Sequence, residues 1–489
     1  MRIRTRRAAA FAVLAAAALF ALTGAASANV PLTQVSADPY TNTTSQHATE
    51  VEPDTFAHHG TVLGTFQVGR FFNGGASDTG VVRSGDGGTT WDAPGFLHLT
   101  FNSGAATSPY ERASDPSVAY DAAHGVWLIS SLPLLPNISS PTVLINRSTD
   151  DGLTWGPPIS IPPPVAHRVD LDKNWTVCDN HAASPFFGHC YTQFDNFGEG
   201  DRMLMTTSTD GGLTWSTPIE TAGHDKGIGG QPVVQSSGRV VVPYETLNNT
   251  VSSFFSDDGG ASWTKSVKVS GIRFHGVAGN LRTSPLPSAE IAGDGTVYVA
   301  WEDCRFRKGC TSNDIVFSKS ADGVSWSDVT RVPIDDLTSS VDHFIPGLAV
   351  DPATSGAGTH LALTYYFYPD ATCAGGCQLD VGYISSPDGG AHWRAPTQLA
   401  GPMTLAQIAQ TSQGPMVGDY ISTSISGGLA TTVFAVGKPA TTAAFDEAMY
   451  APTSRLSIAT VAQATRVATN AGPGLVTGVG TGEAHHALK

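Results

Sequence analysis

Long apolar runs and helical patterns are nearly absent from this 489-residue sequence. Residues 8–22 form an unbroken apolar run, and no later segment is long enough to cross a bilayer. Nor does any later segment repeat apolar residues every 3.6 positions over three turns between helix caps. These absences exclude a multi-span membrane protein and a helical bundle.

The apolar run at residues 8–22 follows the basic start MRIRTRR and precedes small residues that end at Ala28. This order is typical of a secretory signal peptide, so we expect residues 1–28 to be cleaved and the mature protein to be secreted and extracellular. A retained membrane anchor is the alternative, but the run is too short to span a bilayer comfortably.

Basic residues are scarce relative to acidic ones. Lys and Arg number 27 against 42 Asp and Glu, and loss of residues 1–28 would leave 23 basic residues and a formal charge of −19. Such an acidic surface repels phosphate backbones and anionic lipid headgroups. We therefore expect no nucleic-acid partner and no membrane insertion.

Cysteine is also scarce, with six residues in three close pairs: Cys178 with Cys190, Cys304 with Cys310, and Cys373 with Cys377. In an exported chain this even number predicts disulfides, and the spacing favours three small local loops among the 15 connectivities that six cysteines allow. Metal-ligand spacing occurs at Cys373 and Cys377, but no second close pair or nearby histidine completes a zinc site. We expect neither a metal nor another cofactor.

What the sequence does contain is glycine (53 residues), proline (31) and many short valine-, threonine- and aromatic-rich runs. Short runs separated by turn residues predict an all-β chain. Six near-copies of one motif recur along it, with Ser, Asp, Gly and Trp at almost fixed spacing: Ser84 to Trp91, Ser148 to Trp155, Ser208 to Trp215, Ser256 to Trp263, Ser320 to Trp326 and Ser386 to Trp393. Their tryptophans are 64, 60, 48, 63 and 67 residues apart, a period that fits one four-stranded unit with its loops.

Each motif lies between two strand-like runs and therefore on a hairpin turn. There the Asp carboxylate can accept backbone N–H groups, glycine can adopt positive φ, and tryptophan can cover the turn. We expect the motif to serve folding, although the acid pairs Asp150–Asp151 and Asp257–Asp258 also resemble calcium ligands.

The six motifs accompany seven openings of the kind that starts a unit, such as residues 115–120, 231–235 and 416–421. The segment Pro31–Ser36 resembles the strands that follow a motif tryptophan. We expect it to supply the outer strand of the last unit, so that residues 29–465 form one domain of seven four-stranded units. Residues 466–489 have little apolar periodicity and are expected to form a flexible tail.

This run of S-x-D-x-G-x-T-W motifs resembles the Asp-box (bacterial neuraminidase repeat) proteins of the sialidase superfamily. The resemblance implies a β-propeller with four-stranded blades and an Asp-box turn between strands 3 and 4, and the repeat count favours seven blades over six. It implies a sialidase-type exo-glycosidase acting on extracellular carbohydrate or glycoconjugates. A non-catalytic propeller that binds glycan or protein is the alternative, and because a ring closes on itself, a monomer is expected.

The catalytic residues of that family are three arginines that clamp a sugar carboxylate, an Asp acid/base, and a Tyr nucleophile activated by a Glu. The first arginine has no counterpart here, because Val51 stands at its position in Glu50-Val-Glu52-Pro53. In the loop before the first motif, Arg70 and Asp78 lie where the resemblance implies an arginine and the acid. The missing arginine favours binding or a different substrate.

The densest group of charges lies in residues 301–310, where a Cys304–Cys310 bridge would hold Glu302, Asp303, Arg305 and Arg307 in place. The predicted catalytic residues are Asp78, Glu290, Glu302, Asp303 and Tyr366. The predicted substrate-binding residues are Arg70, Arg112, Arg282, Arg305 and Arg307. Other polar residues near the starts of inner strands, including Asp172, Lys173, Asp342, His343 and Asp419, are more typical of packing or pore lining.

Overall fold

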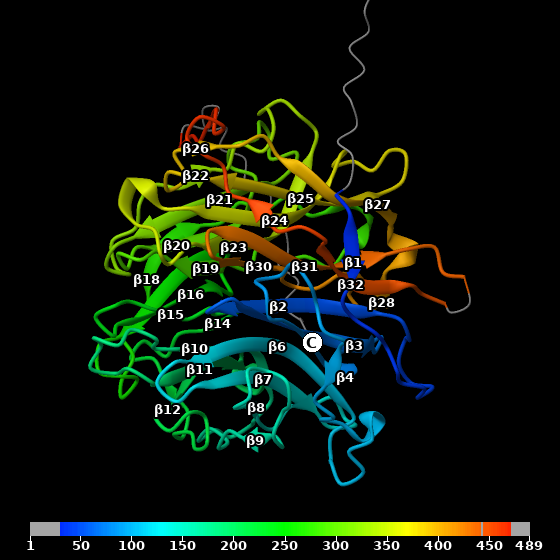
Figure 1. The fold of residues 1–489 in the computed structure, drawn as a ribbon, viewed down its shortest axis with the longest axis vertical. Helices are drawn as coiled ribbons and strands as arrows, with labels where there is room; N and C mark the ends of the chain where they lie inside the picture. The colour runs from blue at the N-terminus through cyan, green and yellow to red at the C-terminus, as the bar shows by residue number, and fades with distance from the viewer. Residues whose placement is uncertain (1–29, 442–443, 471–489) are drawn as a thin grey trace, which may run out of the picture.

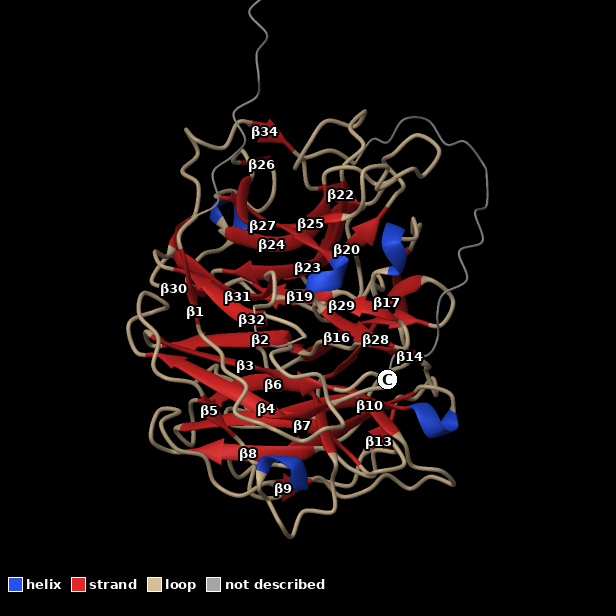
Figure 2. Ribbon diagram, turned by 90° about the vertical axis from the view of Figure 1, so that its right-hand side faces the viewer, coloured by secondary structure: helices blue, strands red, loops and turns tan. Residues whose placement is uncertain are grey.

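The computed structural model describes residues 30–441 and 444–470. Over these ranges the regular structure is almost entirely β, which confirms the predicted class (Figures 1 and 2). The helices there are five three-residue 3₁₀ turns, Phe101–Ser103, Phe197–Glu199, Ala278–Asn280, Gly356–Gly358 and Leu405–Gln407. The predicted signal peptide and the end of the predicted tail lie outside the described residues.

The strands follow one another in four-stranded antiparallel units. The first two units are joined in one sheet by the pairing of Ala76 with Ala113: β2 (Glu50–His58), β3 (Thr61–Arg70), β4 (Ala76–Ser84) and β5 (Gly95–Phe96), then β6 (Arg112–Asp121), β7 (Val126–Leu134), β8 (Leu144–Ser148) and β9 (Ile159–Ser160). The third contains β10 (Leu171–Cys178), β11 (Cys190–Asn196), β12 (Arg202–Ser208) and β13 (Ile219–Glu220).

Later units keep the same order. The fourth has β14 (Gly227–Ile228) and β15 (Val233–Val234) beside β16 (Val240–Thr246), then β17 (Thr250–Ser256) and β18 (Val267–Gly271). The fifth has β19 (Ser288–Ile291), β20 (Val297–Asp303), β21 (Asp314–Ser320) and β22 (Thr330–Arg331). The sixth has β23 (Asp342–Val350), β24 (Leu361–Tyr368), β25 (Gln378–Ser386) and β27 (Thr397–Thr404).

The last unit joins the two ends of the chain. It contains β30 (Ser422–Ser426), β31 (Leu429–Gly437), β32 (Glu447–Pro452) and, from the N-terminus, β1 (Leu32–Gln34), while β33 (Leu456–Ser457) also pairs with β31. Because Leu32 stands opposite Pro452 in an antiparallel pair, the predicted role of the N-terminal segment is confirmed. The short hairpin β28 (Ala409–Thr411) and β29 (Gly414–Met416) precedes this unit.

Inner strands of successive units lie against one another. The contacts run in chain order through β2, β6, β10, β15, β19, β23 and β30, and β30 also contacts β2. In Figure 1 the blue β2 accordingly lies between the cyan β6 and the orange β31. Strands from the start and the end of the chain therefore share one interior.

The six repeated motifs connect the third strand of a unit to its fourth, as predicted. In the third motif Ser208 Oγ donates to Asp210 at 3.0 Å and accepts the Gly212 N–H at 2.9 Å, while Asp210 accepts the N–H and hydroxyl of Thr214 at 2.9 and 2.6 Å. Gly211 and Gly212 have φ of 72° and 79°, which favours glycine. The carboxylate therefore fastens the turn.

Residues at the start of the predicted tail pair with the sixth unit. There β34 (Arg466–Val467) lies antiparallel to β26 (His392–Trp393), which belongs to the last motif, and Trp393 is buried. Residues 466–469 thus have backbone partners.

All three predicted disulfides are present: Cys178–Cys190, Cys304–Cys310 and Cys373–Cys377. Cys178 and Cys190 stand directly opposite each other in β10 and β11. Among the described residues, no helix is both long and apolar enough to span a membrane.

Candidate functional site

Four inner strands carry the same irregularity near their starts. In β2, β6, β10 and β23 the pairing register shifts, and a non-glycine residue there has positive φ: Glu52 (59°), Asp115 (45°), Lys173 (51°) and Ile345 (50°). Such a conformation costs about 1–3 kcal/mol and persists only where the surroundings enforce it, and bulges often re-aim side chains beside active sites. The strain therefore marks this end of the inner strands as a candidate site.

Six charged side chains meet there and form what we call the central charged cluster: Glu52, Arg70, Asp115, Lys173, Arg282 and Asp419. None of them is more than 7% exposed. The Lys173 ammonium lies 3.1 Å from Asp115 Oδ1 and 3.6 Å from Glu52 Oε1, and it contacts Asp419 Oδ2. One cation thus gathers three carboxylates, from β2, from β6 and from the segment before β30.

Arg282 binds Asp419 through two nitrogens. Its Nε lies 2.7 Å from Asp419 Oδ1, and its Nη2 contacts Oδ2. The loop before β19 positions Arg282 by donating its backbone N–H to Pro415 at 2.8 Å. Such bidentate pairs are among the strongest and most directional in proteins.

Arg70 completes the cluster through a glutamine. Its Nη1 lies 2.6 Å from Gln67 Oε1, and the Gln67 amide in turn donates to Glu52 Oε2. The cluster therefore contains three carboxylates and three cations in a nearly dry environment, where an unpaired charge would be costly.

The environment separates the pKa values of two of these acids. Burial raises the pKa of Glu52 to about 7, with Asp115 adding to the increase and Lys173 opposing it. Burial acts in the same direction on Asp419, but Arg282 and Lys173 outweigh it and hold the pKa of Asp419 below its ordinary value. Neighbouring carboxyls with diverging pKa values are a hallmark of acid and base roles.

A small cavity, of about 20 Å³, opens directly on the cluster. Asp115, Lys173 and Asp419 line it, together with Trp175 and Tyr420, whose rings meet edge to face at 5.2 Å. The remaining wall comes from the fourth, fifth and sixth units at Gly229, Gly230, Gln231, Leu286, Pro287, Ser288 and Pro346, and from Asn174. Most units therefore contribute to one central pocket.

Trp175 also borders a second cavity, of about 260 Å³, which runs between the inner strands. Asp54 and Glu290 face it, and burial raises their pKa values to about 7 and about 8. Asp54 accepts the N–H groups of Val118 and Thr55, each at 2.8 Å. Glu290, a predicted catalytic residue, thus lies in this channel and outside the charged cluster.

The two arginines of the bridged loop at residues 301–310 are already paired with carboxylates of the chain. Arg305 binds Asp303 with its Nε at 2.9 Å, and Arg307 binds both Asp314 and Asp335 with its Nη2 at 2.6 Å. Glu302 is fully buried and accepts the Ile345 N–H at 2.8 Å. The structure does not bring these predicted site residues to the central cavity.

Three further predicted residues also lie elsewhere. Asp78 accepts the Tyr40 hydroxyl at 2.6 Å and two backbone N–H groups. Arg112 covers the Phe71 ring and binds Asn73. Tyr366 is buried, with its hydroxyl 3.0 Å from the N and O atoms of Ala435, so it has no access to a ligand. Of the ten predicted site residues, Arg70 and Arg282 join the cluster.

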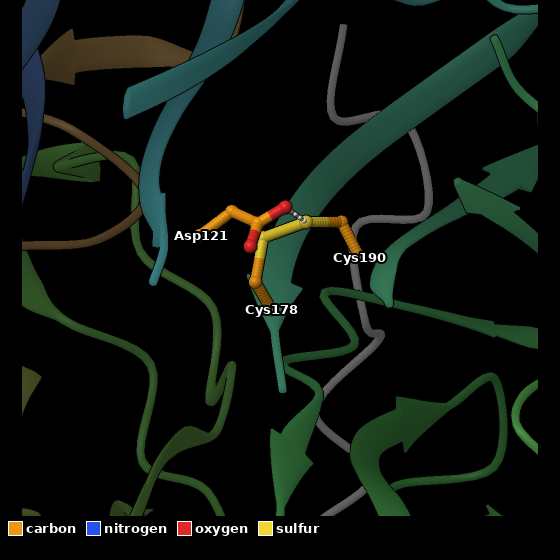
Figure 3. A group of neighbouring side chains, drawn as sticks. All are labelled: Asp121, Cys178 and Cys190. Carbon is orange, nitrogen blue, oxygen red and sulfur yellow. Dashed lines mark hydrogen bonds between the residues drawn. A yellow bond between two sulfur atoms is a disulfide. The ribbon is translucent and has the colours of Figure 1, made fainter. Parts of the chain in front are cut away.

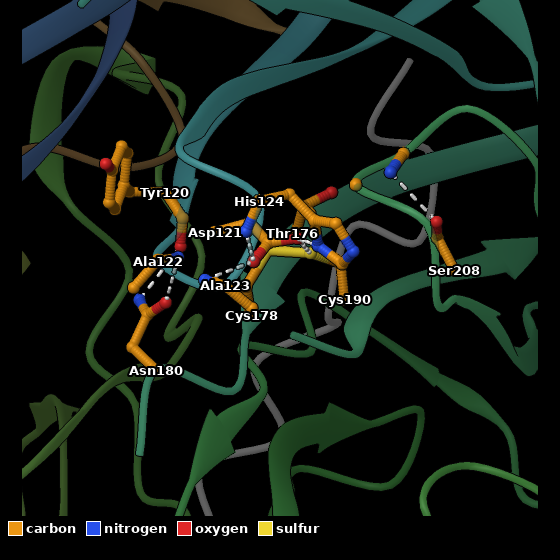
Figure 4. The surroundings of a disulfide bond; sticks show 12 residues. Tyr120, Asp121, Ala122, Ala123, His124, Thr176, Cys178, Asn180, Cys190 and Ser208 are labelled. Carbon is orange, nitrogen blue, oxygen red and sulfur yellow. Dashed lines mark hydrogen bonds and ion pairs between the residues drawn. A yellow bond between two sulfur atoms is a disulfide. The ribbon is translucent and has the colours of Figure 1, made fainter. Parts of the chain in front are cut away.

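Two other groups of side chains have the composition of a metal site. The first is Asp121 with Cys178 and Cys190 (Figure 3), but both sulfurs belong to a disulfide, and Asp121 accepts the Ala123 N–H and binds the His124 ring at 2.7 Å (Figure 4). The second is Asp314, Asp335 and His343, whose carboxylates bind Arg307 and Arg331. In neither group are the donors available as a set.

Glu52, Asp115, Lys173 and Asp419 were not among the predicted site residues. The sequence does contain a pattern that marks two of them, an acid followed by proline near the start of an inner strand. Glu52-Pro53 and Asp115-Pro116 occupy this place in successive units, and Ile345-Pro346 occupies it in the sixth. Val51, which stands where the family has its first arginine, is buried against Ala409 and Met416. Lys173, from another strand, brings a cation to the centre.

Comparisons with known proteins agree with the repeats. Residues 189–347 match the BNR repeat-like domain family. A sialidase of Bacteroides fragilis (strain YCH46) is 28% identical over 188 residues, and this match spans 32% of the present chain and 32% of that protein. Two solved structures match over most of the chain. The first, a Dyadobacter fermentans protein of unknown function, has a TM-score of 0.47 and 17% identity, and the match covers 73% of this chain and 99% of that one. The second, a leech intramolecular trans-sialidase, has a TM-score of 0.41 and 14% identity, and the match covers 87% of this chain and 70% of that one.

Proposed function

Because this chain is a BNR (Asp-box) repeat protein of the sialidase superfamily, we propose that it is a secreted exo-glycosidase built as a seven-bladed β-propeller. The order of inner-strand contacts, from β2 through β30 and back to β2, supports seven blades around one axis. The N-terminal strand β1, paired with β32, supports closure within a single chain and hence a monomer.

One observation carries the activity: the bulges of β2 and β6 bring Glu52 and Asp115 to the same ammonium, that of Lys173, and Asp115 lines a cavity at this end of the inner strands. Glycosidases use two carboxyl groups, one holding a proton for the leaving group and one ionised. Asp115, which lines the cavity and pairs with the Lys173 ammonium, would be the second carboxylate. Glu52, whose pKa is about 7, would hold the proton and pass it directly or through one water.

Lys173 and Arg282 would keep this pair in order without touching the reacting bond. Lys173 binds both Glu52 and Asp115 and thereby fixes their separation, while Arg282 anchors Asp419 on the other side of the ammonium. Trp175 and Tyr420 offer the apolar wall against which a sugar ring packs.

The surroundings support an extracellular glycan as the substrate. Three disulfides and the predicted signal peptide fit an oxidising compartment, and the acidic charge disfavours nucleic acid. A propeller that binds glycan without turnover remains the second candidate, because every cation of the cluster already has a partner in the chain.

A panel of fluorogenic glycosides, including a sialoside, would test the hydrolase. We expect turnover of at least one sugar by the wild type and its loss in Asp115→Asn and Glu52→Gln, with Arg305→Ala as the matched variant in the bridged loop. Activity lost in Arg305→Ala but kept in Asp115→Asn would place catalysis in that loop. If folded wild-type protein turned over none of the glycosides, the hydrolase proposal would be wrong and the glycan-binding propeller would be the remaining candidate.

A further inference from the structure

We infer that Asp419 restricts this site to uncharged sugars by occupying the position that a sugar carboxylate would need. The inference rests on the proposed function and names its substrate class. Asp419 receives two nitrogens of Arg282 and the ammonium of Lys173. A guanidinium fork with an adjacent ammonium is the arrangement that binds a ligand carboxylate, and here the chain supplies that carboxylate itself.

No other cation offers an approaching anion a place. Among the described residues that line the cavity, Lys173 is the only basic one, and it already binds Asp419, Asp115 and Glu52. Arg70 does not line the cavity, and its guanidinium donates to Gln67. A carboxylate in the cavity would therefore meet Asp115 and Asp419 with no free positive charge, and like charges at this range repel strongly in a dry site.

An uncharged sugar meets a different wall. Asn174 lines the cavity, is 2% exposed, and its Oδ1 has no hydrogen-bond partner among the described residues. Its amide nitrogen is committed, since it donates to the Asp115 carbonyl at 2.9 Å and to Ser130 Oγ at 2.8 Å. This buried acceptor needs a donor, which a hydroxyl group can supply and a carboxylate cannot.

Acceptors therefore dominate the polar surface of the cavity, since Asp115, Asp419 and Asn174 all present oxygen atoms. The hydroxyl groups on the edge of a sugar that reaches into this small cavity complement that surface, and the rings of Trp175 and Tyr420 form its apolar border. The specificity follows from one side chain: without the charge of Asp419, Arg282 and Lys173 would become an anion site.

Binding measured by isothermal titration calorimetry tests this without relying on turnover. The ligands are a panel of neutral monosaccharides and N-acetylneuraminic acid, and the proteins are wild type, Asp419→Asn and Asp314→Asn. The last is a matched control, because Asp314 is another buried carboxylate held by two arginines, Arg307 and Arg331, but outside the cavity.

We expect the wild type to bind at least one neutral sugar about tenfold or more tightly than N-acetylneuraminic acid, and Asp419→Asn to shift that ratio toward the acid by about tenfold or more. Asp314→Asn should keep the wild-type ratio. Equal or tighter binding of the acid by wild type, or an unchanged ratio in folded Asp419→Asn, would overturn the inference. Circular dichroism establishes whether each variant folds. If Asp419→Asn does not fold, the ratio of neutral-sugar to N-acetylneuraminic acid affinity in the wild type alone tests the inference.

The outcomes separate this inference from the hydrolase. A neutral-sugar preference without turnover of any glycoside would remove the hydrolase and keep the role of Asp419. Turnover of a sialoside that depends on Asp115 would keep the hydrolase and remove the role of Asp419. Wild-type protein that binds neither class of sugar would contradict both.

Discussion

Lys173 is the residue on which the central charged cluster depends. It is 4% exposed and binds Glu52, Asp115 and Asp419, so its removal takes an ammonium partner from three buried carboxylates at once. Breaking a buried ion pair from one side costs about 3–5 kcal/mol. We expect Lys173→Met to lower the free energy of unfolding by about that amount and to abolish binding and turnover of glycosides, as measured by urea denaturation and the glycoside panel.

The control for this prediction is Lys265→Met, which removes an exposed lysine of the same length. It should change stability by less than about 0.5 kcal/mol. A Lys173→Met protein as stable and as active as Lys265→Met would show that the ammonium does not hold the cluster together.

Single residues of the site were predictable only in part. Arg70 and Arg282 could be selected from their positions, yet Glu52 and Asp115 could not, because their convergence depends on a bulge with positive φ that sequence alone does not specify. The bridged loop was predicted to belong to the site and does not reach the central cavity, for a physical reason. Charge density predicts ion pairs as readily as catalysis, and Arg307 finds Asp314 and Asp335 within its own sheet and the next loop.

At the scale of one element, the Asp-box turn should matter for stability and not for chemistry. In the fourth box Asp258 accepts the N–H and hydroxyl of Ser262 and the hydroxyl of Ser256. Its neighbour Asp257 binds Arg239 at the surface. We expect Asp258→Ala to lower the free energy of unfolding by about 1–2 kcal/mol and Asp257→Ala to change it little.

Thermal and urea unfolding of the two variants, with glycoside turnover as the second readout, would check this pair. If Asp257→Ala were the more destabilising, or if Asp258→Ala lost activity while remaining folded, the turn would have a role beyond folding.

Elements were far more predictable than the site because the repeat specifies them locally. Each box carries its own donors, acceptors and glycines, so the hairpin forms from eight neighbouring residues, as Ser208 to Trp215 illustrates. The pairing of β34 with β26 was not expected, since residues 466 and 467 form a segment only two residues long whose partner is more than 70 positions away. Hydrogen bonds between neighbouring residues can be predicted from the sequence, whereas the pairing of two short segments far apart in the chain cannot.

At the scale of the molecule, the joining of the two chain ends by β1 should stabilise every unit. Removal of β1 exposes the edge of β32 and uncovers the core to which Leu32 and Val35 contribute. We expect a protein that begins at Ala37 to unfold at a lower temperature, in one transition, than a protein that begins at Val30. Unchanged unfolding, or loss of the last unit alone in a separate step, would show that the ends do not close the structure.

The pH dependence of stability also belongs to the whole molecule. Burial raises the pKa of several carboxyl groups above their ordinary values, to about 7 or about 8: Glu50, Glu52, Asp54, Glu245, Glu290, Asp342 and Asp380. Each binds its proton more tightly when folded, so its contribution is fully present below the unfolded pKa near 4.5 or 3.8 and is lost as pH rises through the folded value. Stability should therefore fall between about pH 5 and 8.

The box carboxylates act at the opposite end of the scale. Hydrogen bonds from Thr90 lower the pKa of Asp86 to about 2, and those from Ser325 and Val324 do the same for Asp322, so their contribution is present above pH 3.8 and is lost as pH falls toward 2. The two sets place the maximum of stability at about pH 4 to 6. Urea denaturation from pH 3 to 9 would locate it, and Glu290→Gln should flatten the decline above pH 5. A stability that rises from pH 5 to 8 would mean that the buried acids are ionised in the folded protein.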